Sequence, residues 1–297
     1  MTKILVTGSA GLVGSQVTKD LVERKFDVYS CYNVEKPMDG ILTHLDLASD
    51  KMIIDIMQSI KPEIVIHLAA ITDVEMCETQ HDLASLINTK STKILAQESA
   101  KHDSFFVYMS TDYVFDGTGM KNEKDTPKPL NFYGKSKLAG EIATSNFASS
   151  YSIIRTSTPF GIHQTKKSFP IWIKEKLELK REIPVLIDQF TSPTFVPNLS
   201  QMLIEVITRR INGIIHLAGA TRISRYAFAK IIADRFNLDN TLLKPTKISE
   251  MKWLAQRPQD SSLDVAKAFS LLNNKPKRIE ESLEPFISQL NTSLTLR

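Results

Sequence analysis

The sequence is poor in the residues that build disulfide frameworks and metal sites. Only two of its 297 residues are cysteines, Cys31 and Cys77, which are too few for a disulfide framework and lack metal-binding spacing. The six histidines are scattered without the paired spacing of a zinc site, so we expect no bound metal. Two reduced, structural thiols are typical of a cytoplasmic protein, and we expect that location.

An excess of charge and long apolar runs are also lacking. The net charge is only +4, and the basic residues occur in dispersed pairs rather than in a stripe. We therefore expect no nucleic-acid partner. No apolar run approaches the roughly 20 residues that span a bilayer, so we expect no membrane span. A core strand begins within the first residues, and we expect no signal peptide.

The composition instead indicates a globular protein, with 42% hydrophobic and 24% charged residues. Its first 155 residues alternate apolar strand-like runs with amphipathic helical segments. The expected strands are Lys3–Thr7, Asp27–Tyr32, Glu63–Ala69, Phe105–Met109 and Tyr151–Arg155, and the clearest helices are Lys51–Ile60, Asp82–Lys101 and Tyr133–Phe147. Such buried strands, joined through helices, predict an α/β fold with a doubly wound parallel sheet of the Rossmann type.

The alternation stops after Arg155, and a second region follows. We expect a helix and a short strand within 156–187, a helix over Val196–Arg210 and a late core strand over Gly213–Ala218. The rest is mainly helical. We therefore predict a dinucleotide-binding domain formed by 1–155 plus 188–219, and a smaller, mainly helical substrate-binding region formed by 156–187 plus 220–297.

A glycine-rich turn, Thr7–Gly14 (TGSAGLVG), follows the first strand and opens a helix. Glycine permits the tight turn and lets phosphate groups approach backbone N–H groups at the positive end of the helix. The alternative is a structural turn without a ligand. Its place at the first strand–helix connection favours a dinucleotide cofactor, with Gly8, Gly11 and Gly14 in the turn.

Two further features accompany this turn. Tyr133 and Lys137 form a Y-x-x-x-K pair, which shares one face of a helix. We expect the lysine ammonium to favour the phenolate and so to lower the pKa of Tyr133. Thr111 follows the FFVYM strand, at the sheet edge where doubly wound folds bind ligands. Each feature is common by chance, but their order along the predicted sheet indicates a single site.

With these motifs the chain resembles the extended short-chain dehydrogenases/reductases, and among them the dTDP-4-dehydrorhamnose reductase family. The segments that carry the resemblance extend over nearly the whole chain. They are Thr7–Gly14, Ala69–Thr72 (AAIT), Ser110–Gly117 (STDYVFDG), Pro129–Glu141 (PLNFYGKSKLAGE), Arg155–Ser157 (RTS), Asp188–Thr194 (DQFTSPT) and Arg257–Asp264 (RPQDSSLD).

The resemblance implies a role for each matching position. Tyr133 is the proton donor to a sugar ketone, Lys137 holds the nicotinamide ribose and tunes Tyr133, and Thr111 completes a catalytic triad. The implied cofactor-binding residues are Gly8, Gly11, Leu12, Val13, Gly14, Tyr32, Asn33, Asp46, Leu47, Ala69, Ala70, Ile71, Thr72, Tyr133 and Lys137. The implied substrate-binding residues are Thr111, Asp112, Tyr113 and Thr158.

The sequence departs from the family pattern in two places. The family often has an acidic residue at the end of the second strand, where it binds the ribose 2′-hydroxyl of NAD. Here that strand ends in Tyr32 and Asn33, with no carboxylate before Glu35. This favours NADP, with Lys36 as a helper, and leaves NAD as the alternative. Thr158 stands where family members can carry a tryptophan, which predicts a roomier sugar pocket.

Three functions remain open at this stage. The first is NAD(P)H-dependent reduction of dTDP-4-dehydro-L-rhamnose to dTDP-L-rhamnose, with the dTDP-keto sugar as the small-molecule partner. The second is another nucleotide-sugar reductase or epimerase. The third is a non-enzymatic, NADP-binding regulatory subunit, because LAQRP and RFNLDN resemble segments of the methionine adenosyltransferase β-subunit. Whether the chain forms a homodimer is left open.

Overall fold

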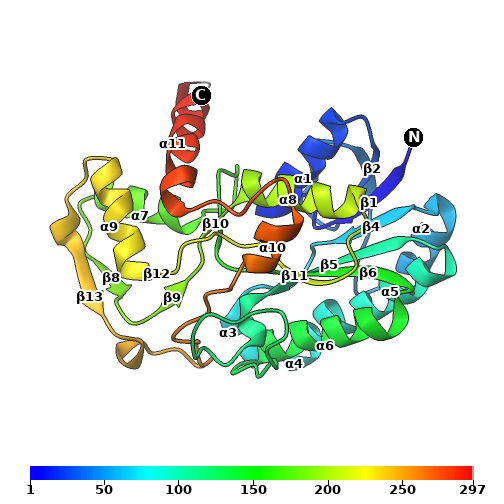
Figure 1. Cartoon of the computed structure of the whole chain (residues 1–297), viewed down its shortest axis with the longest axis horizontal. Coiled ribbons are helices and arrows are strands. Elements are labelled where there is room, and N and C mark those ends of the chain that lie inside the picture. The colour runs from blue at the N-terminus through cyan, green and yellow to red at the C-terminus, as the bar shows by residue number, and fades with distance from the viewer. Residues whose placement is uncertain (296–297) are drawn as a thin grey trace.

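A seven-stranded sheet forms the centre of the computed structural model, which describes residues 1–295 (Figure 1). Its strand order is β11-β6-β5-β4-β1-β2-β3, and all neighbours are parallel. The strands are β1 (Lys3–Thr7), β2 (Asp27–Tyr32), β3 (Ile41–His44), β4 (Ile64–His67), β5 (Phe105–Thr111), β6 (Ser150–Thr156) and β11 (Gly213–His216). The order reverses between β1 and β4. The predicted doubly wound α/β fold is thus confirmed.

Alternating side chains of the strands build a core on each face of the sheet. Ile4 and Val6 of β1 face one core, whereas Leu5 faces the other. The first core is closed by α1 (Leu12–Glu23), α8 (Val196–Thr208) and α10 (Ala266–Leu271). The second is closed by α2 (Asp50–Ile60) and α5 (Ser91–Lys101), and α6 (Phe132–Phe147) packs beside α5. Figure 1 shows α1 and α8 above the sheet and α5 and α6 below it.

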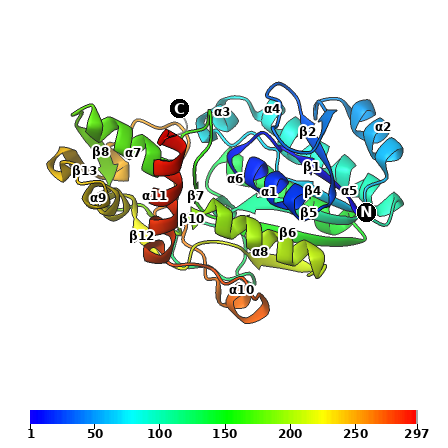
Figure 2. The same cartoon turned by 90° about the horizontal axis from the view of Figure 1, so that it is seen from above.

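A second group of elements lies to one side of the sheet in both views (Figure 2). Its main members are α7 (Phe169–Glu178), β8 (Ile183–Leu186), α9 (Arg225–Arg235), β13 (Leu243–Thr246) and α11 (Ile279–Thr295). Short pieces connect it to the sheet, namely β7 (Pro159–Phe160), β9 (Phe190–Thr191), β10 (Thr194–Phe195) and β12 (Ile223–Ser224). β8 and β13 pair in parallel.

This group has a core of its own, centred on Phe160. The Phe160 ring centre lies 5.6 Å from those of Phe195, Phe228 and Phe286. The cluster draws on both segments of the predicted substrate-binding region, but Phe195 comes from the predicted dinucleotide-binding domain. The exact division of the chain into two domains therefore stays a prediction. The last two residues of the predicted substrate-binding region, 296–297, lie outside the described residues.

Two local features differ from the sequence-based expectation. The sequence does not indicate the edge strand β3, because this strand is only four residues long and its Ile41 and Leu42 are half-exposed. The single helix expected over Asp82–Lys101 is divided into α4 (His81–Ser85), a π-helical turn over Leu86–Lys90, and α5. α3 (Val74–Thr79) precedes them. Within residues 1–295, no helix combines the length and the apolar character needed to cross a membrane.

The π-helical turn places Asn88 in the interior. Its side-chain amide accepts a bond from Ile71 N at 2.8 Å and donates to Ile71 O at 3.0 Å. It also donates to Ser136 Oγ, on α6, at 3.0 Å. π-Helical turns often occur at functional sites. Here the hydrogen bonds of Asn88 link the loop after β4 to α6.

A buried ion pair joins α6 to the sheet. Arg155 on β6 donates to Glu141 on α6 from Nε at 2.9 Å and from Nη2 at 2.7 Å. Ser110, opposite Arg155 on β5, donates a third bond to the same carboxylate. The side chains of Arg155 and Glu141 are only 1% and 5% exposed. Removal of one partner would leave the other charge buried and uncompensated.

We predict that Arg155→Met lowers the free energy of unfolding by about 3–5 kcal/mol, measured by urea denaturation. The double variant Arg155→Met/Glu141→Leu should recover much of this loss, because it removes both buried charges. Lys19→Met breaks an exposed pair with Glu23 and should change stability little. Equal losses in the single and the double Arg155 variants would contradict the prediction.

Candidate active site

A cleft of about 1000 Å³ follows the carboxyl edge of the sheet. All residues that the sequence nominates for the site, apart from the helper Lys36, lie in its lining, although their roles stay predictions. They are Gly8, Gly11, Leu12, Val13, Gly14, Tyr32, Asn33, Asp46, Leu47, Ala69, Ala70, Ile71, Thr72, Thr111, Asp112, Tyr113, Tyr133, Lys137 and Thr158. The cleft lies where the strand order reverses, the usual ligand position in doubly wound sheets.

The glycine turn at one end of the cleft is too tight for side chains at two positions. A Cβ on Gly14 would lie 2.0 Å from Gly8 O, and a Cβ on Gly8 would lie 2.8 Å from Ala69 N. Gly8 also has φ +70°, in the left-handed region. Gly11 caps α1, yet no side chain of the described residues bonds to the first-turn amides there. A helix start of this kind can accept a diphosphate, so the turn fits a dinucleotide.

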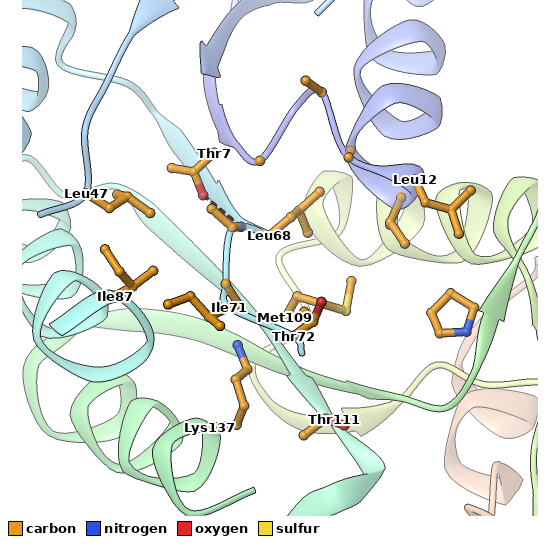
Figure 3. Close-up of a pocket in the computed structure, with 18 of the residues that line it drawn as sticks. Thr7, Leu12, Leu47, Leu68, Ile71, Thr72, Ile87, Met109, Thr111 and Lys137 are labelled. Atoms are coloured by element: carbon orange, nitrogen blue, oxygen red, sulfur yellow. Dashed lines mark hydrogen bonds between the residues drawn. The ribbon is translucent and has the colours of Figure 1, made fainter. Parts of the chain in front are cut away.

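The loop after β4 forms the floor next to this turn. Thr7 Oγ1 accepts a hydrogen bond from Ala69 N at 3.2 Å, the dashed line in Figure 3. The same hydroxyl lies 2.7 Å from His67 Nδ1, and His67 Nε2 lies 3.0 Å from Thr92 Oγ1. Burial lowers the pKa of His67 to about 3, so its ring is neutral near pH 7. We interpret His67 as a structural support of this loop.

The three catalytic candidates come from two adjacent elements. Thr111 ends β5, while Tyr133 and Lys137 occupy the first two turns of α6. The start of α6 is fixed by Asn131, whose Oδ1 accepts a bond from Gly134 N at 2.9 Å. Figure 3 shows Lys137 extending from α6 toward Ile71, with Thr111 across the floor of the cleft.

The expectation that Lys137 lowers the pKa of Tyr133 is wrong. Burial raises the pKa of Tyr133 above its ordinary value, and a hydrogen bond with Thr111 offsets this only in part. The ammonium of Lys137 lies 4.2 Å from the centre of the Tyr108 ring, where it makes a cation–π contact. Tyr133 is therefore a neutral phenol near pH 7, the form that can donate a proton.

Burial shifts the pKa of two titratable side chains at the site, Lys137 and Asp112. Burial lowers the pKa of Lys137 to about 7, while the nearby Glu141 carboxylate acts to raise it. On the substrate side, Asp112 accepts bonds from Thr111 Oγ1 at 2.9 Å and Ser157 Oγ at 2.8 Å. Burial nevertheless raises the pKa of Asp112. Lys137 and Asp112, the residue after Thr111, therefore both have shifted pKa values, as is common at functional sites.

The second group of elements contributes one wall of the cleft. Thr158 belongs to this wall and has φ +44°, a conformation unusual for a β-branched residue. Strained residues of this kind concentrate at functional sites. A tryptophan here would have to adopt the same backbone conformation.

Sequence reasoning missed two cations of this wall. Arg225, directly after the N-cap of α9, lies 5.1 Å from the Phe169 ring centre and lines the cleft. Lys166 lies at the opposite end, close to Glu35. The expected helper Lys36 is absent from the residues that line the cleft. No motif marked these positions, because each reaches the cleft only through packing of the second group against the sheet.

No cluster of three or more histidine, cysteine or acidic residues suited to a metal occurs in the part of the chain that the structure describes. The polar groups of the cleft are instead backbone amides, hydroxyls, phenols, cations and the separate carboxylates of Glu35, Asp46 and Asp112. Such a set can hold a dinucleotide and polarise or protonate a carbonyl oxygen.

Comparison with known proteins agrees with this geometry. The family model described as RmlD substrate binding domain matches residues 1–292. Methionine adenosyltransferase 2 subunit beta of Xenopus tropicalis is 32% identical, over 96% of this chain and 88% of that protein. dTDP-4-dehydrorhamnose reductase of Aggregatibacter actinomycetemcomitans is 30% identical, over 96% of this chain and 98% of that protein.

A solved structure shares both fold and sequence with the chain. It is dTDP-4-dehydrorhamnose reductase from Bacillus anthracis in complex with NADP, with a TM-score of 0.87 and 31% identity. The match covers 97% of this chain and all of that one. Because the family model and these relatives extend over nearly the whole sequence, the chain belongs to the dTDP-4-dehydrorhamnose reductase family of nucleotide-sugar reductases.

Proposed function

We propose that the chain reduces dTDP-4-dehydro-L-rhamnose to dTDP-L-rhamnose with NADPH as the hydride donor. The main support for this proposal is that Thr111, Tyr133 and Lys137 line the same cleft as the glycine turn. A positioned acid and a dinucleotide site are the two requirements for reduction of a ketone.

The cofactor assignment rests on the fit of the glycine turn and on the relative from Bacillus anthracis, whose structure contains NADP. Gly11, Leu12 and Val13 would bind the diphosphate, and Asp46 and Leu47 the adenine. The loop after β4 would hold the central part. NADPH would supply the hydride, whereas the side chains of the chain supply the proton. NAD remains the alternative cofactor.

Tyr133 would donate its proton to the ketone oxygen of the sugar. Its raised pKa keeps the phenol protonated until transfer. Lys137, one helical turn away, would hold the nicotinamide ribose. Thr111 would hydrogen-bond the ketone oxygen. For this its hydroxyl has to turn away from Asp112, to which it donates at 2.9 Å.

The nucleotide sugar would lie between the sheet edge and the second group of elements. Thr111, Asp112 and Tyr113 would face it from the sheet and Thr158 from the other wall. Arg225 is placed to neutralise a diphosphate, because its guanidinium lines the cleft close to Tyr113 and Asp112. A different nucleotide sugar, reduced or epimerised, is the nearest alternative substrate.

A second candidate function is that of a regulatory subunit. It is favoured by the 32% identity to methionine adenosyltransferase 2 subunit beta of Xenopus tropicalis over nearly the whole chain. The intact Thr111, Tyr133 and Lys137 set favours the reductase, although a regulatory subunit could retain it. The two functions differ in turnover and in partner, and both can be measured.

We predict that Tyr133→Phe lowers turnover of dTDP-4-dehydro-L-rhamnose by about 10²–10⁴-fold, because it removes the proton donor and keeps the ring. NADPH oxidation, followed by absorbance, measures turnover. NADPH binding should be retained. Tyr151→Phe, on β6, is the matched control and should retain full activity. Near wild-type turnover of Tyr133→Phe would contradict the role of Tyr133.

We also predict a pH-dependent contribution of Lys137 to stability. Between its native pKa of about 7 and its ordinary value of 10.5, the unfolded chain binds a proton that the native protein does not. The free energy of unfolding should therefore rise with pH above 7, by up to about 1.4 kcal/mol per pH unit, relative to Lys137→Met. Urea denaturation from pH 6 to 9 measures it.

The exposed Lys135→Met on the same helix is the control for this measurement, and its stability should run parallel to that of the wild type throughout. Parallel curves for the wild type and Lys137→Met would show that Lys137 does not titrate in this range.

A test of turnover and of partner binding separates the candidate functions. We expect the purified chain to consume one NADPH per molecule of dTDP-keto sugar and not to co-elute with a methionine adenosyltransferase catalytic subunit in size-exclusion chromatography. Conversion of a nucleotide sugar without net NADPH consumption would indicate an epimerase. Co-elution without turnover would instead establish the regulatory function.

A further inference from the structure

A loop of the second group of elements, residues 161–168, reaches across to the sheet. His163 Nε2 lies 3.1 Å from Ala10 O in the glycine turn, and Gln164 Nε2 lies 2.9 Å from Met38 Sδ. His163 Nδ1 accepts bonds from the backbone N–H groups of Thr165 and Lys166. Nε2 therefore carries the proton and donates to Ala10 O. His163 thus shapes the loop and fastens it to the turn.

This attachment brings Lys166 to the carboxyl end of β2. Lys166 Nζ lies 3.6 Å from Glu35 Oε1, and Thr165 Oγ1 lies 3.5 Å from Glu35 Oε2. Lys166, Glu35, Tyr32 and Asn33 all line the cleft. In doubly wound dinucleotide-binding folds the end of the second strand meets the adenosine ribose, whose 2′ position distinguishes NAD from NADP.

The charges at this end of the cleft suit either form of the ribose. Glu35 alone would accept a hydrogen bond from a 2′-hydroxyl but would repel a 2′-phosphate. Lys166 alone would attract the phosphate. Both side chains are about half-exposed, at 56% for Lys166 and 48% for Glu35, so each can turn toward a ligand without a loss of packing. The remaining acidic group nearby in the lining is Asp46, after β3.

We propose that the Lys166–Glu35 pair sets the preference between the two nicotinamide dinucleotides. Lys166 binds the 2′-phosphate of NADPH, and Glu35 accepts a hydrogen bond from the 2′-hydroxyl of NADH. This rests on the proposed function, because it deepens the cofactor assignment of the same cleft. In this proposal, a residue of the second group of elements contacts the cofactor and distinguishes NADPH from NADH.

The test is a titration of NADPH and NADH, followed by protein fluorescence, and its readout is the ratio of the two affinities. Lys166→Ala should shift this ratio about tenfold toward NADH, because it removes one charge-assisted contact to the phosphate. Glu35→Gln should shift it severalfold toward NADPH. Lys167→Ala is the matched control, since Lys167 pairs with Glu175, 2.7 Å away, and does not line the cleft.

Ionic strength gives a second readout. Contacts between half-exposed charges are screened by salt, so 0.5 M salt should reduce the preference of the wild type for NADPH. In Lys166→Ala only the repulsion between Glu35 and the 2′-phosphate is left to screen, so salt should shift the ratio of this variant in the opposite direction, toward NADPH. Equal effects of Lys166→Ala and Lys167→Ala, no effect of either, or a shift toward NADH in Glu35→Gln would overturn the proposal.

Failure of the proposed function has a different signature. A wild-type chain that binds neither dinucleotide would overturn both the cofactor assignment and the role of Lys166. A wild-type chain that binds NADPH with a ratio insensitive to Lys166 would overturn the role of Lys166 alone.

Discussion

The ion pair between Glu141 and Arg155 is the interaction on which the candidate active site depends. Tyr133, Lys137 and Glu141 lie four residues apart in sequence on α6 and so occupy one face of the helix. The bonds from Arg155 and Ser110 to Glu141 therefore hold this face against β5 and β6. The same carboxylate acts to raise the pKa of Lys137, so one buried charge positions the helix and supports the ammonium.

Much of the fold and of the candidate site could be predicted from local patterns. Strands buried on both faces appear in the sequence as short apolar runs, and their alternation with helices is sufficient to indicate a doubly wound sheet. The site residues are predictable for the same reason. The glycine turn, Thr111 and the loop after β4 directly follow strands, and parallel strands end at the same sheet edge.

The features that could not be predicted depend on tertiary packing. The π-helical turn over Leu86–Lys90 adjusts the helix so that Asn88 meets Ile71, and the local sequence does not show it. Arg225 and Lys166 line the cleft only because the second group of elements packs against the sheet. The raised pKa of Tyr133 likewise follows from burial, while the Lys137 ammonium lies over the Tyr108 ring.

The core around Phe160 has a consequence for synthesis of the protein on the ribosome. Phe160 packs against Phe286 of α11, so residues near the middle and near the end of the chain share one core. All the strands of the central sheet have been synthesised by His216, about 80 residues before the chain ends. The nascent chain can therefore complete its sheet while the second core still lacks α11. Until α11 has been synthesised, Phe160 lacks one of its aromatic packing partners, and transiently exposed apolar surface of this kind is prone to aggregation.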